Sequence, residues 1–304
     1  MKSCPPVLLL LVTMLLSVND FAQTPNSSGV KVERGLLFAS AGGKNLKLDL
    51  YLPQNVSGNV PVVVVIYGGA WMMRNPGLET PKAKWLAGHG YAAAVIDYRL
   101  SSEALFPAQI YDCKAAVRWL RANAVKYGLD AAHIGAWGDS SGGHLACLLG
   151  TTRNGVLEGD EGNTNESSQV QAVVDFFGPT DLLQMGAHAL PGSWIDHNSP
   201  QAPEALLIGG PVQKNPEKAE QANPIKYITH DAPPFFIAHG EQDLLVPCNQ
   251  SELLFDALKK AHDNVTFYKI AGAGHEDRAF DSVMMRGAVL AFFDKYLKSA
   301  GANP

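Results

Sequence analysis

The stretch that decides the fold is Gly138-Asp139-Ser140-Ser141-Gly142-Gly143, which follows an apolar run ending at Trp137 and precedes the apolar run 144–149. A strand, this motif and a helix in direct succession predict a sharp strand-to-helix turn. Such a turn strains the backbone of its serine and needs neighbouring glycines, because larger side chains would clash. The sequence therefore predicts that the Ser140 hydroxyl projects above a sheet, near the positive N-terminus of a helix.

Further strands flank this motif on both sides. Residues 60–66 form a continuous β-branched run, which is typical of a strand buried on both faces, and residues 92–97 form a second one. Residues 31–53 predict an antiparallel hairpin at a sheet edge, turning around residues 41–45. Other short strands are expected at 133–137, 170–177, 234–239 and 265–270.

Helical periodicity appears between the strands. Apolar residues recur at helical spacing over 109–127, and Gly128 follows as a stop signal. This alternation predicts the α/β class, with a mostly parallel central sheet covered by helices on both faces and ligands at the carboxyl ends of the strands. Residues 182–223, which are long, rich in Pro and Gly and contain Trp194, predict a cap insertion; a surface excursion is the alternative.

The composition limits the function classes. With 304 residues, 46% of them hydrophobic, the chain can build a sizeable core, which excludes intrinsic disorder. The net charge is −5 and no long basic run occurs, so neither nucleic acid nor an anionic membrane is expected as a partner. Lys2 and the apolar stretch 7–18 predict a signal peptide over 1–22, followed by one domain over 23–304 in a secreted or periplasmic protein.

Cysteines and acidic residues give no sign of a metal site. Cys113, Cys147 and Cys248 remain after the signal peptide; an odd number is no disulfide framework, and whether any two of them pair stays open. The acidic residues 158–166 lack the spacing of a calcium loop and predict a solvated loop. No metal and no cofactor is predicted.

A serine nucleophile needs a base, and the base needs an orienting acid. His275 lies on a Gly-rich loop directly after a predicted strand, and it is the candidate base for Ser140. Asp243 lies on the turn after the preceding strand and is the candidate acid, in the chain order Ser, Asp, His. The alternatives for the acid are Asp175, Asp181 and Asp277. His144 and His239 are interpreted as structural or supporting groups.

Acyl transfer also requires hydrogen-bond donors for the negative oxygen of the tetrahedral intermediate. Residues 67–71, Tyr-Gly-Gly-Ala-Trp, follow the β-branched strand directly. We predict that the backbone N–H groups of Gly69, Ala70 and Ser141 form this oxyanion hole; a simple tight turn at 67–71 is the alternative. Three aromatic residues are the candidates for substrate binding: Tyr67, Trp71 and Trp194.

Together these residues resemble the α/β-hydrolase esterases of the hormone-sensitive-lipase-like group, especially bacterial feruloyl and acetylxylan esterases. The matching segments are 67–71, 97–100 with 106–108, 138–143, 239–243 with 246–247, and 274–275. The resemblance implies the α/β-hydrolase fold and a cofactor-free Ser-His-Asp mechanism, with Asp97 and Arg99 as supporting residues. One departure is Tyr67, where the group usually has a His that braces the oxyanion loop.

The sequence thus leads to an exported serine carboxylic ester hydrolase, and the resemblance implies acetyl or feruloyl esters of plant polysaccharide as its substrates. A generalist carboxylesterase for short acyl chains is the close alternative. A serine peptidase shares the same residues, but no separate gating domain is present. A non-catalytic binding module would typically have lost Ser140, Asp243 or His275.

Overall fold

A computed structural model describes residues 29–54, 56–261 and 264–298. Its centre is an eight-stranded sheet in the order β1-β2-β4-β3-β5-β6-β7-β8, parallel from β4 to β8 and antiparallel at β1 and β2. The strands are β1 (Val30–Ala41), β2 (Lys44–Pro53), β3 (Val60–Ile66), β4 (Ala92–Ile96), β5 (Leu129–Asp139), β6 (Ala172–Phe176), β7 (Phe235–Gly240) and β8 (Val265–Ile270). The predicted α/β-hydrolase architecture is confirmed.

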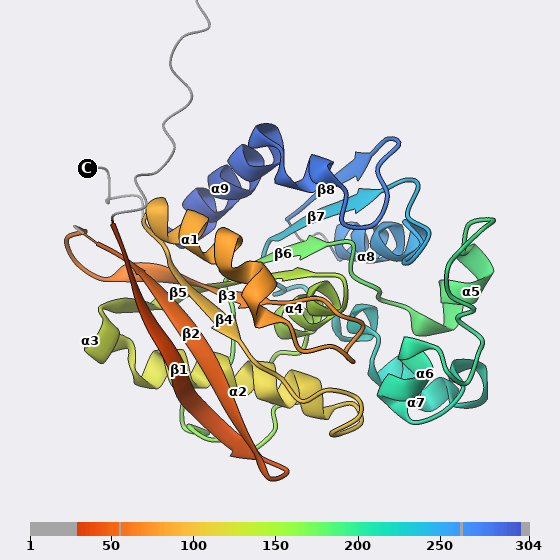
Figure 1. Ribbon diagram of the computed structural model, residues 1–304, viewed down its shortest axis with the longest axis horizontal. Helices are drawn as coiled ribbons and strands as arrows, with labels where there is room; N and C mark the ends of the chain where they lie inside the picture. Colours follow the sequence, from red (N-terminus) through yellow and green to blue (C-terminus); the bar gives the residue numbers. More distant parts are fainter. Residues whose placement is uncertain (1–28, 55, 262–263, 299–304) are drawn as a thin grey trace, which may run out of the picture.

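Helices cover both faces of this sheet (Figure 1). The α-helices of the described residues are α1 (Thr80–Gly88), α2 (Ala108–Ala122), α3 (Ala124–Tyr127), α4 (Ser141–Thr151), α5 (Met185–His188), α6 (Pro203–Ile208), α7 (Pro216–Gln221), α8 (Asn249–Lys260) and α9 (Val283–Leu297). One face packs against α1 and α9, and the other packs against α2, α4 and α8. Both faces of the central strands are therefore shielded from solvent, as their unbroken apolar sequences predict.

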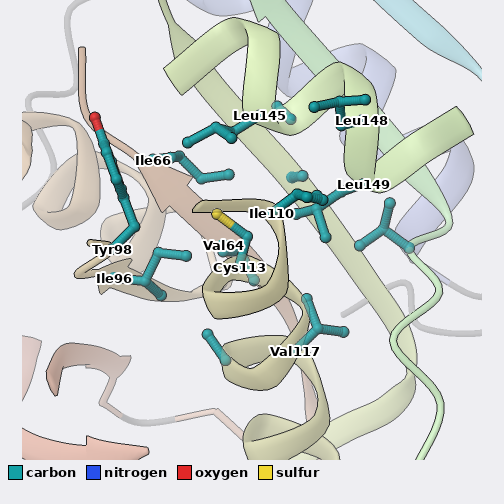
Figure 2. Packing of buried hydrophobic residues seen from close by; sticks show 14 of the residues in the cluster. Val64, Ile66, Ile96, Tyr98, Ile110, Cys113, Val117, Leu145, Leu148 and Leu149 are labelled. Atoms are coloured by element: carbon teal, nitrogen blue, oxygen red, sulfur yellow. The ribbon is translucent and has the colours of Figure 1, made fainter. Parts of the chain in front are cut away.

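The core is continuous around β3. Every residue of β3 is buried, and its alternate side chains enter the two separate apolar clusters on the two faces. Figure 2 shows Val64 and Ile66 of β3 facing Ile110 of α2 and Leu145 of α4. This packing fixes the carboxyl end of β3 and the start of α4 against each other.

The turn between β5 and α4 has the strained geometry that its sequence predicts. Ser140 has φ 55° and ψ −123°, a conformation that L-residues rarely adopt. A Cβ on Gly138 would lie 2.0 Å from the carbonyl oxygen of Gly142, and a Cβ on Gly142 would lie 2.0 Å from that of Ile66. Only glycine fits at these two positions, because the backbone at Gly138 closely approaches that at Gly142, and Gly142 in turn closely approaches the end of β3.

The predicted elements match with small differences. The hairpin of β1 and β2 lies at the sheet edge, as predicted. The helix predicted over 109–127 is two helices, because the chain is not helical at Asn123; Gly128 ends the second one in the left-handed conformation. β5 begins at Leu129, earlier than predicted, since Leu129 pairs with Val60 across a register irregularity.

Residues 182–223 contain the short helices α5, α6 and α7, and these lie beyond the carboxyl ends of the strands (Figure 1). The predicted solvated loop at 158–166 is wrong for two of its acids: Glu158 pairs with Lys114 and Arg118, and Glu161 pairs with Arg99. Lys114 and Arg118 of α2 also donate to backbone carbonyls in and next to this loop, such as those of Val156 and Gly162, and so hold the loop to α2.

The three cysteines are free thiols, so no two of them pair. The predicted signal peptide at 1–22 lies outside the described residues. Among the residues that the structure describes, no helix is both long and apolar enough to cross a bilayer.

We expect Val64→Ala to lower the free energy of unfolding by about 2 kcal/mol, because it removes two buried methyl groups and leaves a cavity in the most crowded strand. Val125→Ala on α3 is the matched control, since Val125 is 96% exposed and should change stability by less than about 0.5 kcal/mol. Urea unfolding of both variants measures the difference. Equal losses would contradict the assignment of β3 to the core.

Candidate active site

Ser140, His275 and Asp243, which come from three different loops, lie in one hydrogen-bonded chain. The Ser140 Oγ–H donates to His275 Nε2 at 3.0 Å, and His275 Nδ1–H donates to Asp243 Oδ2 at 2.7 Å. Because a carboxylate accepts but does not donate, this contact places the proton of the neutral imidazole on Nδ1 and leaves Nε2 free to accept. The arrangement can therefore take a proton from the serine hydroxyl as the oxygen attacks a carbonyl.

The Asp243 carboxylate is buried and fully hydrogen-bonded. Its Oδ1 accepts from the backbone N–H groups of Leu245 and Val246, both at 2.8 Å. Burial alone raises the pKa of this carboxyl, but the hydrogen bonds from His239 and His275 outweigh burial and hold its pKa well below the ordinary value. Asp243 is thus charged throughout the neutral range and can stabilise a positive charge on His275.

His239 is a second histidine on the same carboxylate. Its Nε2 lies 3.2 Å from Asp243 Oδ2 and donates to the carbonyl of Val246 at 2.9 Å, while its Nδ1 accepts from the Ser251 hydroxyl at 2.7 Å. These contacts occupy both ring nitrogens, so His239 is a supporting group, in agreement with the interpretation of its sequence position. Its position in the sequence does not indicate that it faces Asp243, because only the turn after β7 brings the two side chains together.

The other acid candidates are engaged elsewhere. Asp181 accepts from the N–H of Leu183, and Asp277 accepts from the N–H of Ala279, so each caps a short 3₁₀-helix. Asp175 is completely buried under the turn between β5 and α4, which we call the elbow, and its Oδ1 accepts from the N–H of Gly178 at 3.0 Å. Burial raises the pKa of Asp175 to about 7. Of the four acid candidates, Asp243 is the one whose carboxylate accepts a hydrogen bond from His275.

The predicted oxyanion donors lie beside Ser140. Within the described ranges, the backbone N–H groups of Gly69, Ala70 and Ser141 have no intramolecular acceptor. Ala70 and Trp71 have φ near 55°, a conformation that costs about 1–3 kcal/mol per residue. A loop that holds unpaired N–H groups in a strained backbone can stabilise an oxygen that gains negative charge.

Tyr67 braces this loop in place of the expected histidine. Its hydroxyl donates to Asp97 at 3.0 Å, and its ring stacks on Tyr98 at 4.6 Å between centroids. The Tyr98 hydroxyl returns a hydrogen bond to the Tyr67 carbonyl at 3.1 Å. The departure at Tyr67 therefore leaves the loop supported. Arg99, in turn, is held by Asp112 in the interior, away from this contact.

Two cavities adjoin these residues. The small cavity has a volume of about 30 Å³, and the residues that line it are Ala70, Trp71, Ser140, Ser141, Pro179, Ile195, Pro203, Glu204, Leu245 and Val246. The large cavity has a volume of about 450 Å³ and includes Gly68, Gly69 and Tyr67 in its wall. Within the described residues no cluster of three or more His, Cys, Asp or Glu side chains has the arrangement of a metal site.

The predicted substrate-binding residues differ in position. Trp71 is buried, packs edge-on against His144 and reaches the small cavity. Trp194 is 73% exposed and is absent from the walls of both cavities, although its neighbour Ile195 lines the small one. The indole of Trp194 thus lies outside the pocket in which we expected it, because residues 193–195 turn toward Leu244 through the backbone.

Three charged side chains form a buried cluster beneath the elbow, and the sequence analysis did not predict it. Lys82 of α1 lies 2.5 Å from Asp139 and 2.6 Å from Glu79. Burial raises the pKa of Asp139 to about 6, although the Lys82 ammonium opposes this rise. Asp139 is part of the motif at residues 138–143, but its partners Glu79 and Lys82 are distant in sequence. No sequence motif links them to Asp139. All three line the large cavity.

Known proteins are similar to this chain in sequence and in fold. The sequence model of the BD-FAE family matches residues 48–258. Esterase LipC of Mycobacterium tuberculosis is 30% identical over 223 residues, which cover 71% of this chain and 52% of LipC. The chain spans about half the length of the curated relatives it matches.

Two solved structures are similar over a larger share of this chain. A truncated carbohydrate esterase from gut microbiota has a TM-score of 0.80 at 34% identity, with 88% of this chain and 97% of that chain covered. A bifunctional GH43-CE protein of Bacteroides eggerthii has a TM-score of 0.77 at 37% identity, with 87% of this chain and 38% of that chain covered.

We expect Asp175→Asn to flatten the pH dependence of stability. Folding raises the pKa of Asp175 from about 4 to about 7, so the folded protein binds more protons between these values and loses stability as the pH rises through them. Asparagine cannot titrate. Between these pH values the free energy of unfolding of the variant should therefore fall by up to about 1.4 kcal/mol less per pH unit than that of the wild type. Urea unfolding from pH 4 to 8 measures the slope. The exposed Asp256→Asn is the control, and parallel curves for Asp175→Asn and the wild type would contradict this account.

Proposed function

This chain belongs to the BD-FAE family, and on that premise we propose that it is an exported serine carboxylic ester hydrolase that removes acetyl or feruloyl groups from plant polysaccharide. The observation that carries the proposal is the hydrogen-bonded chain from Ser140 through His275 to Asp243, with unpaired N–H groups beside it. No cofactor is part of this chemistry.

The positions of these atoms support the following reaction. Ser140 Oγ attacks the ester carbonyl while its proton passes to His275 Nε2, and Asp243 stabilises the resulting imidazolium through Nδ1. The negative oxygen accepts hydrogen bonds from the N–H groups of the oxyanion loop and of Ser141. His275 then gives the proton to the leaving alcohol, and water releases the acyl group from Ser140 by the same route.

The size of the small cavity favours acetyl over feruloyl. Its 30 Å³ holds about two water molecules by the same measure, since each needs about 10–15 Å³. The methyl group of an acetyl ester fits there, whereas an aryl acyl group would require Ile195 and Leu245 to move. We therefore favour acetyl among the two proposed acyl groups.

Two observations support a polysaccharide substrate and export. The two solved structures described above are named as a carbohydrate esterase and as a bifunctional GH43-CE protein. The N-terminal residues 1–22 have the composition of a signal peptide. Export would place the enzyme where plant polymers occur outside the cell.

A generalist short-chain carboxylesterase is the second candidate. Relatives such as LipC of Mycobacterium tuberculosis are named only as esterases, and a small acyl cavity fits acetyl esters of any alcohol. The two candidates differ in the alcohol that they require.

We expect Ser140→Ala to lower kcat/KM for p-nitrophenyl acetate by at least about 10³-fold, because the substitution removes the hydroxyl that is hydrogen-bonded to His275 Nε2. Ser57→Ala, at an exposed serine, is the control and should keep wild-type activity. The same assay on acetylated xylan, methyl ferulate and p-nitrophenyl butyrate separates the candidates. Full activity in Ser140→Ala would exclude the proposed mechanism.

We expect Ile195→Ala to raise the ratio of kcat/KM for p-nitrophenyl butyrate to that for the acetate by about tenfold, because removal of three carbons makes room for two more methylenes. Leu206→Ala is the matched control, since Leu206 lies on α6 of the same insertion and is absent from the wall of the small cavity. An unchanged ratio in Ile195→Ala would show that the small cavity does not hold the acyl group.

A further inference from the structure

The two cavities beside Ser140 differ fifteenfold in volume, from about 30 Å³ for the small one to about 450 Å³ for the large one. An ester has two halves, and an enzyme must place both of them at the same time. The large cavity falls within the range of about 300–1,000 Å³ that is typical of ligand sites. The proposed function assigns no role to the large cavity.

Proton transfer decides which half enters which cavity. The leaving alcohol oxygen must come within hydrogen-bond reach of His275 Nε2, because that nitrogen returns the proton. Two neighbours of His275 line the large cavity: the ring of Phe177 lies edge-on against the imidazole at 4.6 Å, and Glu276 is the next residue along the chain. The alcohol half therefore points toward the large cavity when the acyl half occupies the small one.

The walls of the large cavity combine apolar rings with polar groups. Trp137, Phe177 and Phe280 contribute aromatic surface, and Phe177 and Phe280 pack on each other at 4.6 Å. Glu79 and Lys82, with side chains only 8% and 14% exposed, place charged groups at the same wall. A sugar ring has both apolar C–H faces and hydroxyl groups that donate and accept, so it matches such a mixed wall.

The charge of the wall distinguishes among sugars. Five acidic residues line the large cavity, and two basic residues, Lys82 and Arg286, accompany them. Lys82 is already paired with Asp139 and Glu79, and Arg286 is paired with Asp281. A carboxylate on the substrate would meet mostly negative groups, which disfavours acidic sugars.

We propose that the large cavity is the subsite for the alcohol half of the ester and that it takes a neutral carbohydrate. This inference rests on the proposed function and deepens it, because it assigns the alcohol to a place and a chemical class. It also implies that selectivity for polysaccharide resides in η2 (Pro76–Glu79), the start of α1 and the loop after His275. Residues 182–223 contribute instead to the small cavity.

Asn75→Trp tests the proposal. Asn75 is exposed, lines the large cavity and makes no side-chain hydrogen bond within the described chain, so tryptophan adds bulk without removing a contact. Leu78→Trp, at an exposed residue of the same wall, is the second variant in case the first fails to fold. Val125→Trp on α3 is the control for a surface tryptophan far from either cavity.

The substrates are monoacetylated xylotriose, whose alcohol half is a neutral trisaccharide, and ethyl acetate, whose alcohol half has only two carbons. We expect Asn75→Trp and Leu78→Trp to lower kcat/KM for the acetylated xylotriose by about tenfold or more, chiefly through KM, and to lower that for ethyl acetate by less than about threefold. Val125→Trp should leave both within about twofold of wild type. The wild type should also prefer acetylated xylotriose to acetylated trigalacturonate by about tenfold.

Equal losses on the two acetates, or no loss on the acetylated xylotriose in either folded variant, would overturn the subsite assignment. A preference for acetylated trigalacturonate would overturn the choice of a neutral sugar. These results are distinct from failure of the proposed function, in which the wild type hydrolyses neither acetate or Ser140→Ala retains the activity. Thermal unfolding of each variant shows whether it is folded.

Discussion

The close contact between the β5–α4 turn and the end of β3 is the constraint on which the rest of this structure depends. Gly142 lies so near the Ile66 carbonyl that no side chain fits between them, and Ser140 adopts a strained backbone as a result. Strain of this kind persists only where the surroundings enforce it. Here the enforcement comes from β3, which is buried on both faces, and from α4, whose apolar residues pack against the same cluster.

This constraint also explains where the chemical groups gather. In a parallel sheet the carboxyl ends of the strands lie at one edge, so the loops after β3, β5, β7 and β8 meet there. Each loop supplies one part of the site: the oxyanion loop, Ser140, Asp243 and His275 in turn. None of these parts is complete alone, because the serine needs the base, the base needs the acid, and the intermediate needs the N–H groups.

Buried charge supports the same edge from below. Asp139 and Lys82 connect the elbow to α1, and His239 gives Asp243 a second imidazole neighbour. Such pairs cost desolvation free energy, and breaking one by removing a partner leaves an uncompensated buried charge. The position of the catalytic candidates therefore depends on side chains that do not take part in the chemistry. Asp139 and Lys82 also line the large cavity, so the pair that supports the elbow is part of the surface that a substrate would meet.

The sequence by itself determined the strand-to-helix elbow, the central buried strands, the edge hairpin and the choice of Ser140, His275 and Asp243, because each rests on local composition or on residue order along the chain. It did not reveal Glu79 and Lys82 beneath the elbow, His239 on Asp243, or the exposure of Trp194, because these depend on which distant residues the sheet brings together. It also predicted a solvated loop at 158–166, whereas Lys114, Arg118 and Arg99 neutralise that loop from distant positions on and before α2. The volumes of the two cavities belong to the same class of property: a volume is set by how side chains from several elements pack, and only the tertiary structure decides it.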